Sequence, residues 1–353
     1  MSGLGTLSQS YKASLFAAPR LYGLDMVQLP QQAGGDETPS RRRKWTAAAR
    51  LGMLVAVLAL IAWYVAVNAK SFRALGDVTW TSLAAALALD SLIYVYGAGA
   101  IVLTVHVFGT RPGAVETLLL SILTRFGNLL LPLRGGAAAR AVYLNRTHGL
   151  TYSDFLAGMS AMLLATVAVS LLCSLGGLAW IGLATGKTFP RVTWVLAAGL
   201  AAVSLTAVLR PRIGSGDAGG VRGRIQRLLD GYHLVSRHRP TLLGLLGIGG
   251  LQIVTMAWIY AVLLAAMGKP AGLGILIVIV ALGNICTVVQ LTPGNVGVYE
   301  GVLAILGSMM GLAVADILAA SLAWRALDTA LILAAGPISS YVLTGKALFK
   351  NRD

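Results

Sequence analysis

The sequence predicts an all-helical, polytopic membrane protein, and three observations lead to this fold class. The chain has 353 residues, of which 57% are hydrophobic and only 12% are charged, whereas a soluble domain has about 25% charged residues. Several apolar stretches reach the length of about 20 residues that a helix needs to cross a hydrocarbon core of about 30 Å. The basic residues, which give a net charge of +15, gather in short runs between these stretches. We therefore exclude a soluble enzyme, a disordered protein and a disulfide scaffold.

The excess of positive charge favours a membrane topology over a nucleic-acid partner. Cytoplasmic loops of membrane proteins accumulate Lys and Arg, and short basic runs between apolar stretches fit that pattern. No basic region with interleaved aromatic residues is large enough to read bases. We expect no nucleic-acid partner.

Six apolar stretches are predicted to cross the membrane as full spans. They cover residues 51–67, 80–105, 155–184, 192–209, 241–268 and 314–341. Each is apolar over a length suited to a transmembrane helix.

Two further pairs of apolar segments flank a proline. Segments 115–131 and 135–147 lie on either side of Pro132, and both are short and carry charges. Such half-length segments fit a re-entrant hairpin better than two full spans. The second pair, around Pro293, consists of segments 272–291 and 296–311. Its first segment is long enough to span alone, so two ordinary crossings remain an alternative there.

A parity argument gives the two hairpins opposite orientations. The positive-inside rule places the basic regions 41–50, 210–240 and 346–352 in the cytoplasm. An even number of crossings must separate these regions, so each proline-flanked pair contributes zero or two crossings. With zero, the first hairpin dips in from the cytoplasm and the second from outside. The result is an inverted-topology repeat, as in many secondary transporters.

The same reasoning divides the chain into three parts. Residues 1–45 are expected to form a disordered, basic cytoplasmic segment, and residues 46–345 a transmembrane domain with a basic cytoplasmic loop at 210–240. Residues 346–353 are expected to form a basic cytoplasmic tail, which places both termini in the cytoplasm.

The strongest local motif lies between the two segments of the second pair. Its residues are Pro293, Gly294, Asn295, Gly297 and Glu300. Proline and glycine break a helix, and at bilayer depth broken backbone is tolerated only where protein buries it or where it lines a wet cavity. The next helix would present free N–H groups to a phosphate or carboxylate. The alternative is a tight connection between two ordinary spans.

Three ionisable residues lie deep in the second half of the chain. They are Glu300, Arg325 and Asp328, and the last two share a helix face because they are three residues apart. A charge in mid-membrane costs at least about 2.5–3.5 kcal/mol, so such residues face the interior and usually pair. We expect either a structural ion pair or a headgroup or proton site.

The first hairpin offers Arg134 and Arg140 near the start of its second helix, with Asn128 before Pro132. A guanidinium presents a planar fork to phosphate oxygens, so these residues are candidates for lipid binding. The alternative is snorkelling toward anionic headgroups. Four further polar residues are secondary candidates, namely Asp90, His106, Glu116 and Arg125. The alternative for them is an interfacial position, which is usual for a lone polar residue near a helix end.

The sequence contains none of the catalytic patterns that would indicate an enzyme. A zinc-protease motif, a serine-hydrolase elbow, a Walker loop and a His/Cys cluster are all missing. Cys173 and Cys286 lie far apart in apolar stretches and are interpreted as small buried residues. We therefore expect a non-enzyme without a metal or cofactor.

Two motifs resemble those of a known family. They are Pro132-x-Arg134-x-Gly136-x-x-x-Arg140, followed by Leu144, and Thr292-Pro293-Gly294-x-x-Gly297-x-x-Glu300 with Arg325. The chain resembles the lysylphosphatidylglycerol synthase transmembrane-region family, also called flippase-like integral membrane proteins, over roughly 48–345. The resemblance implies a bacterial inner-membrane protein that moves or handles lipids. It does not imply lysyl transfer, which belongs to a separate soluble domain.

The leading hypothesis is a flippase or transporter for a phospholipid or polyprenyl-phosphate type of lipid, with the anionic headgroup as its ligand. A second hypothesis is a non-transporting partner of a cell-envelope glycosyltransferase or lipid-modifying enzyme, docked through the 210–240 loop. A third, less favoured because no nucleophile or metal set is visible, is an intramembrane enzyme acting on a polyprenyl-phosphate.

Overall fold

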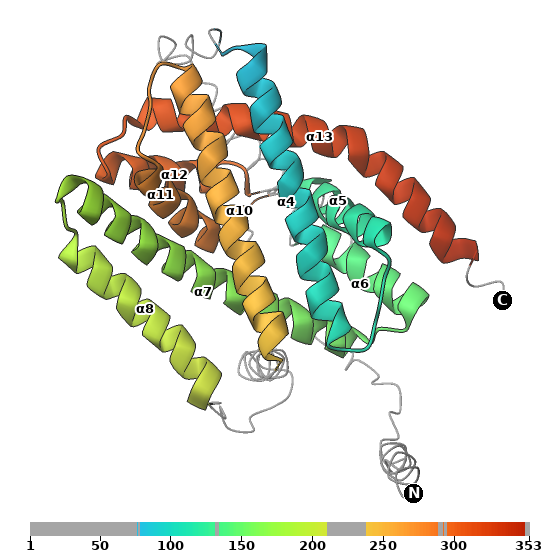
Figure 1. The fold of residues 1–353 in the computed structure, drawn as a ribbon. Helices are drawn as coiled ribbons and strands as arrows, with labels where there is room; N and C mark the ends of the chain where they lie inside the picture. The colour runs from blue at the N-terminus through green and yellow to red at the C-terminus, as the bar shows by residue number, and fades with distance from the viewer. Residues whose placement is uncertain are drawn as a thin grey trace, which may run out of the picture. The chain divides into compact units, whose positions relative to one another are not determined.

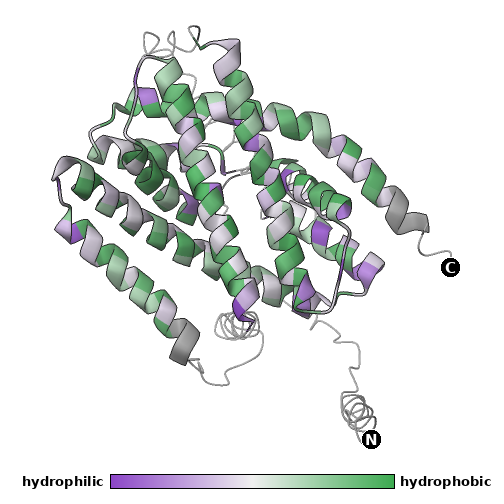
Figure 2. Cartoon of the chain, in the orientation of Figure 1, coloured by the Kyte–Doolittle hydropathy of each residue, from purple (hydrophilic) through white to green (hydrophobic). Residues whose placement is uncertain are grey.

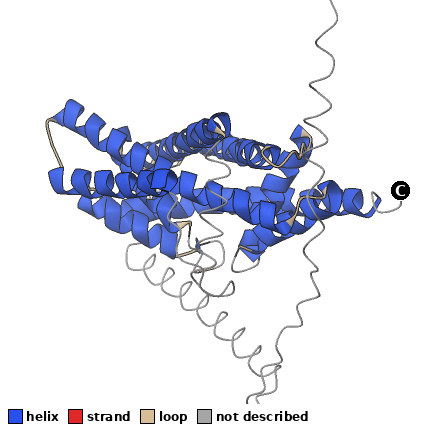
Figure 3. Cartoon of the chain, turned by 90° about the horizontal axis from the view of Figure 1, so that it is seen from below, coloured by secondary structure: helices blue, strands red, loops and turns tan. Residues whose placement is uncertain are grey.

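The computed structural model describes residues 76, 78–130, 134–209, 238–288, 292 and 295–349. The chain divides into two compact units, Met1–Gly52 and Met53–Asp353, and every described residue belongs to the second. In this part of the chain all regular elements are helices (Figure 3).

The first half of the described chain has four helices in the order long, short, short, long. They are α4 (Trp80–His106), α5 (Ala114–Leu130), α6 (Gly135–His148) and α7 (Tyr152–Thr185). Threonine caps begin both long helices, because the hydroxyl groups of Thr79 and Thr151 accept from the backbone N–H groups of Ser82 and Asp154. Gly149 ends α6 in a left-handed conformation that favours glycine. One more apolar helix, α8 (Pro190–Leu209), follows.

The second half repeats the order long, short, short, long. Its helices are α10 (Arg239–Ala266), α11 (Leu273–Cys286), α12 (Val298–Met309) and α13 (Val314–Phe349). With 14 residues, α11 is about 21 Å long, shorter than a hydrocarbon core of about 30 Å. The recurrence of this order supports a repeat of the two halves.

The predicted helix bounds agree with the structure except at α11 and α13. Within the apolar segment 272–291, α11 ends at Cys286, five residues before the end of the segment. The Thr287 hydroxyl donates to the Asn284 carbonyl at 2.7 Å, and this local bond competes with continuation of the helix. At the other end of the chain, α13 continues to Phe349, past the predicted limit of 341.

Four described helices, α4, α7, α10 and α13, are long and apolar enough to cross a membrane. Figure 2 shows the hydrophobic colouring along most of their length. Large apolar side chains also face outward, including Trp180, Leu183 and Trp194, which are 64%, 90% and 76% exposed. An outer surface of this kind suits lipid rather than water, so this is a multi-pass helical membrane protein. The predicted span at 51–67 lies outside the described residues, and a total of six spans stays a prediction.

The long helices α4 and α10 pack side by side and run in opposite directions, in front of the other helices in the view of Figure 1. The largest core cluster gathers around α10 and includes Ile253, Ile259 and Tyr260, each at most 1% exposed. The short helices pack across the two halves, since α5 lies against α13 and α11 lies against α7. Each half of the described chain therefore completes the packing of the other.

Two glycines, Gly127 and Gly136, allow α5 and α6 to pack closely against each other. A Cβ atom on Gly127 would lie 2.5 Å from the Gly136 Cα, and a Cβ atom on Gly136 would overlap the carbonyl oxygen of Thr124. The helices approach so closely that only hydrogen fits at both positions. This contact holds the start of α6, and with it Arg134, against the end of α5.

Candidate functional site

A cavity of about 200 Å³ lies among α5, α10, α11, α12 and α13. Its polar and charged lining residues are Arg125, Gln252, Asn284, Thr287, Asn295, Arg325 and Asp328. Of these, Asn295, Arg325 and Asp328 are predicted site residues, and the structure brings them together. Arg125 comes from the first half of the chain, so the cavity is built by both halves.

The first buried ion pair beside the cavity joins α12 to α13. The Nε and Nη2 atoms of Arg325 donate to the Glu300 Oε1 at 2.9 and 2.7 Å. The other carboxylate oxygen of Glu300 accepts the backbone N–H of Gly297 at 2.7 Å. Glu300 is only 3% exposed, and it thereby satisfies one of the free N–H groups at the start of α12. Gly297 has a φ of +84°, which explains the need for glycine there.

The second ion pair joins α5 to α13. The Arg125 Nη1 donates to the Asp328 Oδ1 at 3.2 Å, and the Tyr94 hydroxyl donates to the same oxygen at 2.7 Å. The Arg125 guanidinium also lies over the Tyr94 ring, 4.7 Å from its centroid. Next to this pair the Trp324 indole donates to the Asp90 Oδ1 at 2.9 Å.

These contacts answer two questions that the sequence left open. Among the three deep ionisable residues the ion pair joins Arg325 to Glu300, while Asp328 pairs with Arg125 of another helix. Asp90 and Arg125 are not interfacial, since Asp90 is fully buried and Arg125 lies in the bundle. The sequence signal for them was present, namely two charges within apolar segments, but no local spacing connects residues on α4 and α5 with α13.

Glu116 is likewise buried rather than interfacial, at 6% exposed. Its Oε1 atom accepts from the Tyr143 hydroxyl at 2.8 Å and lies 2.7 Å from the His148 Nε2. These contacts connect the first turn of α5 to the last turns of α6, and they hold the hairpin at the end away from Arg134. The role of Glu116 is therefore structural.

Arg134 connects the two short-helix pairs. Its Nη2 atom donates to the carbonyl oxygens of Thr287 and Val288, both at 2.8 Å. The last carbonyl groups of a helix carry partial negative charge, so this guanidinium stabilises the C-terminal end of α11. Arg134 and Asn295 are also the two described non-glycine residues with positive φ, at 60° and 57°. Each stands two residues after the proline of its motif, so a positive-φ residue recurs at the equivalent position of both halves.

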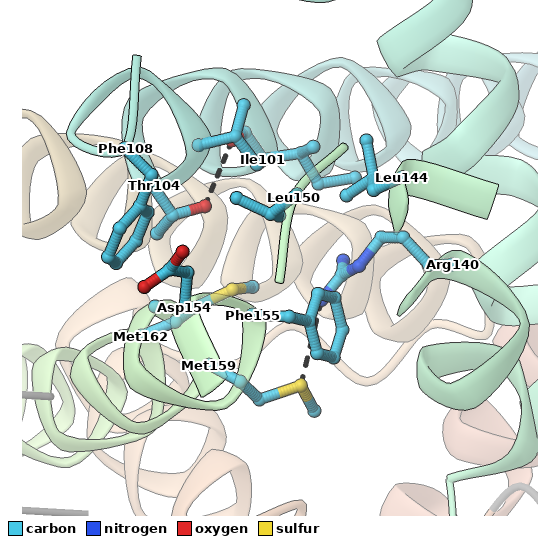
Figure 4. Close-up of a pocket in the computed structure, with 12 residues that line it drawn as sticks. Ile101, Thr104, Phe108, Arg140, Leu144, Leu150, Asp154, Phe155, Met159 and Met162 are labelled. Atoms are coloured by element: carbon cyan, nitrogen blue, oxygen red, sulfur yellow. Dashed lines mark hydrogen bonds between the residues drawn. The ribbon is translucent and has the colours of Figure 1, made fainter. Parts of the chain in front are cut away.

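Arg140 is buried without an acidic partner among the described residues. It is 7% exposed, its Nη2 atom lies 3.7 Å from the Met159 sulfur, and its guanidinium lies 5.3 Å from the Phe155 ring centroid. Figure 4 shows the side chain directed toward both residues, with Asp154 on the far side of Phe155. The Asp154 carboxylate accepts from Thr151 instead, at 2.7 Å. Arg134, which carries a charge of the same sign, stands six residues earlier, at the start of the same helix.

An apolar cleft of about 460 Å³ lies beside these arginines, between α6 and α7. Arg134 is the charged residue that lines it, and the walls consist mainly of Ala, Val, Leu, Phe and Met side chains. Such a cleft combines a cationic edge with an apolar wall.

The remaining predicted site residues have structural contacts or lie outside the described residues. The Asn128 Oδ1 accepts the backbone N–H of Gly136 at 3.0 Å and so holds the start of α6. The Asn295 side-chain nitrogen donates to the Cys286 carbonyl at 3.4 Å, while its oxygen is buried without a hydrogen-bond partner. Pro293 and Gly294 belong to the undescribed positions.

Comparison with protein families assigns the chain. The family model for the lysylphosphatidylglycerol synthase transmembrane region matches residues 48–336. The chain belongs to the lysylphosphatidylglycerol synthase transmembrane-region family. The match contains both arginines of the first hairpin, the cavity and both ion pairs, so all of these lie within the family domain. No curated protein matches the chain.

Proposed function

We propose that this member of the lysylphosphatidylglycerol synthase transmembrane-region family is a flippase or transporter for a phosphate-bearing lipid, of the phospholipid or polyprenyl-phosphate type. The observation that carries the proposal is the apolar cleft between α6 and α7, with Arg134 at its edge and Arg140 buried beside it. In this proposal the chain moves lipid without changing it chemically.

The lack of a described acidic partner for Arg140 favours an anionic ligand. A buried guanidinium is costly unless it is paired and hydrogen-bonded, and Met159 and Phe155 supply only weak contacts. A phosphate group would offer several charge-assisted hydrogen bonds to two neighbouring guanidinium groups. The apolar wall of the cleft would hold the acyl or polyprenyl chain of the same molecule.

The central cavity would provide a second polar binding site for the headgroup. It is lined by Arg125, Arg325 and Asn295, and both halves of the chain contribute to it. Arg134 bridges the cleft and the cavity, because it lines the first and donates to α11 next to the second. Rocking of one half against the other would alternate access to the cavity, as in transporters with inverted repeats.

The proposal includes the membrane in which the protein lies and the side on which its termini lie. A bacterial inner membrane with both termini in the cytoplasm fits the basic runs of the sequence. A membrane-associated enzyme that uses or supplies the lipid is a compatible partner.

Reconstitution in liposomes tests the function. Purified protein would be incorporated into vesicles with fluorescently labelled phosphatidylglycerol, and translocation would be measured by chemical quenching of the outer leaflet. The Arg140→Ala variant is expected to slow translocation about 10–100-fold, because a charge-assisted hydrogen bond contributes about 1.5–3 kcal/mol. Arg146→Ala, on an exposed position of the same helix, is the matched control and should behave like the wild type.

Two outcomes would count against the proposal in different ways. Normal translocation by Arg140→Ala would show that this arginine is not part of the path. Absence of translocation of every phosphate-bearing lipid by the wild-type protein would remove the transport function itself.

A further inference from the structure

The polar cluster where α4, α5 and α13 meet contains more negative than positive charge. Its acidic residues are Asp90 and Asp328, which are 0% and 4% exposed, and its one guanidinium is that of Arg125. Arg125 bonds to Asp328, not to Asp90. If both carboxyl groups were ionised, the cluster would therefore hold one uncompensated buried negative charge.

The contacts of Asp90 indicate which group is in excess. Its Oδ1 atom accepts from the Trp324 indole, while its Oδ2 atom is buried and has no hydrogen-bond partner. An ionised carboxylate seeks hydrogen bonds at both oxygens, and a buried carboxyl group without them becomes neutral instead. The Oδ2 atom of Asp90, which has no hydrogen-bond partner and lies near the Asp328 carboxyl group, is therefore the expected position of a proton.

Apart from Arg125, the described helices packed around Asp90 supply no net positive charge that would balance an ionised Asp90 carboxylate. On α4 itself the neighbouring titratable group is Tyr94, which donates to Asp328. The described helices α7 and α10 carry their charged residues in the first turn, at Asp154 and Arg239. The other ion pair beside the cavity, Arg325 with Glu300, contributes one charge of each sign.

We propose that Asp90 and Asp328 form a proton-binding pair beside the cavity. Asp90 holds one proton while Arg125 is bonded to Asp328. When an anionic headgroup in the cavity draws the Arg125 guanidinium away, Asp328 takes a second proton from a hydronium ion or buffer acid of the aqueous phase. One bond to that proton breaks in the acid, whose conjugate base stays in solution, and a new O–H bond forms on Asp328. One proton is thus bound for each negative charge that replaces Asp328 at Arg125. The second step rests on the proposed lipid transport, whereas the first does not.

Infrared spectroscopy of the purified protein in detergent tests the resting proton. The wild-type protein is expected to show the C=O stretching band of a protonated, buried carboxyl group at neutral pH. Asp90→Asn should remove the band, and Asp90→Glu should shift it. Asp316→Asn, a change in the first turn of α13, should leave it in place. Absence of the band from the wild type, or its persistence in Asp90→Asn, would overturn the proposal.

Proton uptake tests the second step. Short-chain phosphatidylglycerol would be added to the protein in weakly buffered neutral detergent with a pH indicator, and short-chain phosphatidylcholine would serve as the uncharged control. The wild type is expected to take up about one proton per bound phosphatidylglycerol and none with phosphatidylcholine, by the charge count of the pair. Asp328→Asn should bind lipid without uptake, while Asp90→Asn should retain uptake.

The two experiments separate the possible failures. Binding of phosphatidylglycerol without uptake in the wild type contradicts coupling between the anion and the pair. No binding at all contradicts the proposed function, and the infrared band still decides whether Asp90 holds a proton.

Discussion

The buried charges of this protein are paired between different helices, and in one case these helices lie far apart in the sequence. Glu300 and Arg325 are separated by 25 residues, and Arg125 and Asp328 by 203 residues. Because the carboxylates of both pairs are buried, an ion pair that loses its arginine leaves a costly negative charge behind. The arginines and acids of the cavity therefore fix the packing of α12 and α5 on α13.

Removal of one member of the Glu300–Arg325 pair should cost more than removal of both. Arg325→Met leaves the buried Glu300 carboxylate without this guanidinium, and we expect a loss of about 3–5 kcal/mol. Adding Glu300→Gln should recover part of the loss, because the neutral amide no longer requires a cation. Thermal unfolding in detergent, followed by tryptophan fluorescence, measures the midpoints. If the loss of stability in the double variant equalled the sum of the losses in Arg325→Met and Glu300→Gln alone, the two residues would not be coupled.

At the scale of elements, the hairpin of α5 and α6 depends on close backbone contact. Gly127 and Gly136 face each other at the crossing, and the Asn128 side chain holds the N–H of Gly136. The start of α6 is thus fixed by contacts within the hairpin, while Arg134 attaches the hairpin tip to α11. The two short-helix pairs are connected through their tips.

A methyl group at position 136 should open this hairpin. In Gly136→Ala the new Cβ atom would overlap the Thr124 carbonyl oxygen, and overpacking of this kind typically costs about 1–3 kcal/mol. The expected result is a lower unfolding midpoint and slower lipid translocation. Gly301→Ala, on α12, is the matched control, because its Cβ atom would meet nothing within 4 Å. Similar midpoints for the two variants would argue against a close helix crossing.

At the scale of the whole molecule, the two halves share the helix order long, short, short, long and a positive-φ residue two positions after each proline. In each half a short helix packs against the last long helix of the other half, α5 against α13 and α11 against α7. Both observations fit an inverted repeat in which the hairpins dip into the membrane from opposite faces.

Cysteine labelling in intact cells or oriented vesicles tests this topology. Single cysteines at Gly113 and Gly272, in a variant with Cys173 and Cys286 replaced by alanine, probe the loops that precede α5 and α11. Neither site has an atom within 4 Å of a new Cβ, so the probes should not disturb the fold. A membrane-impermeant maleimide applied from outside should label position 272 and leave position 113 unlabelled. Labelling of both positions from the same side would contradict the inverted arrangement.

The helices of the described chain were predictable because their signal is local. Composition and the lengths of apolar stretches predict α4, α7, α10 and α13, and Pro132 correctly separates α5 from α6. The end of α11 was missed, because Arg134 and the Thr287 hydroxyl act on its last turn and one of these comes from 153 residues away.

The sequence alone determined the membrane class, the family and the order of long and short helices, because hydrophobicity, helix-breaking residues and motif spacing are properties of neighbouring residues. Only the tertiary structure decided the partners of the buried charges. It paired Arg325 with Glu300 and Arg125 with Asp328, and it left Asp90 beside Asp328 and Arg140 beside Met159. Electrostatic partners depend on which helices pack together, and that packing is a cooperative property of the whole bundle that no single stretch of sequence encodes.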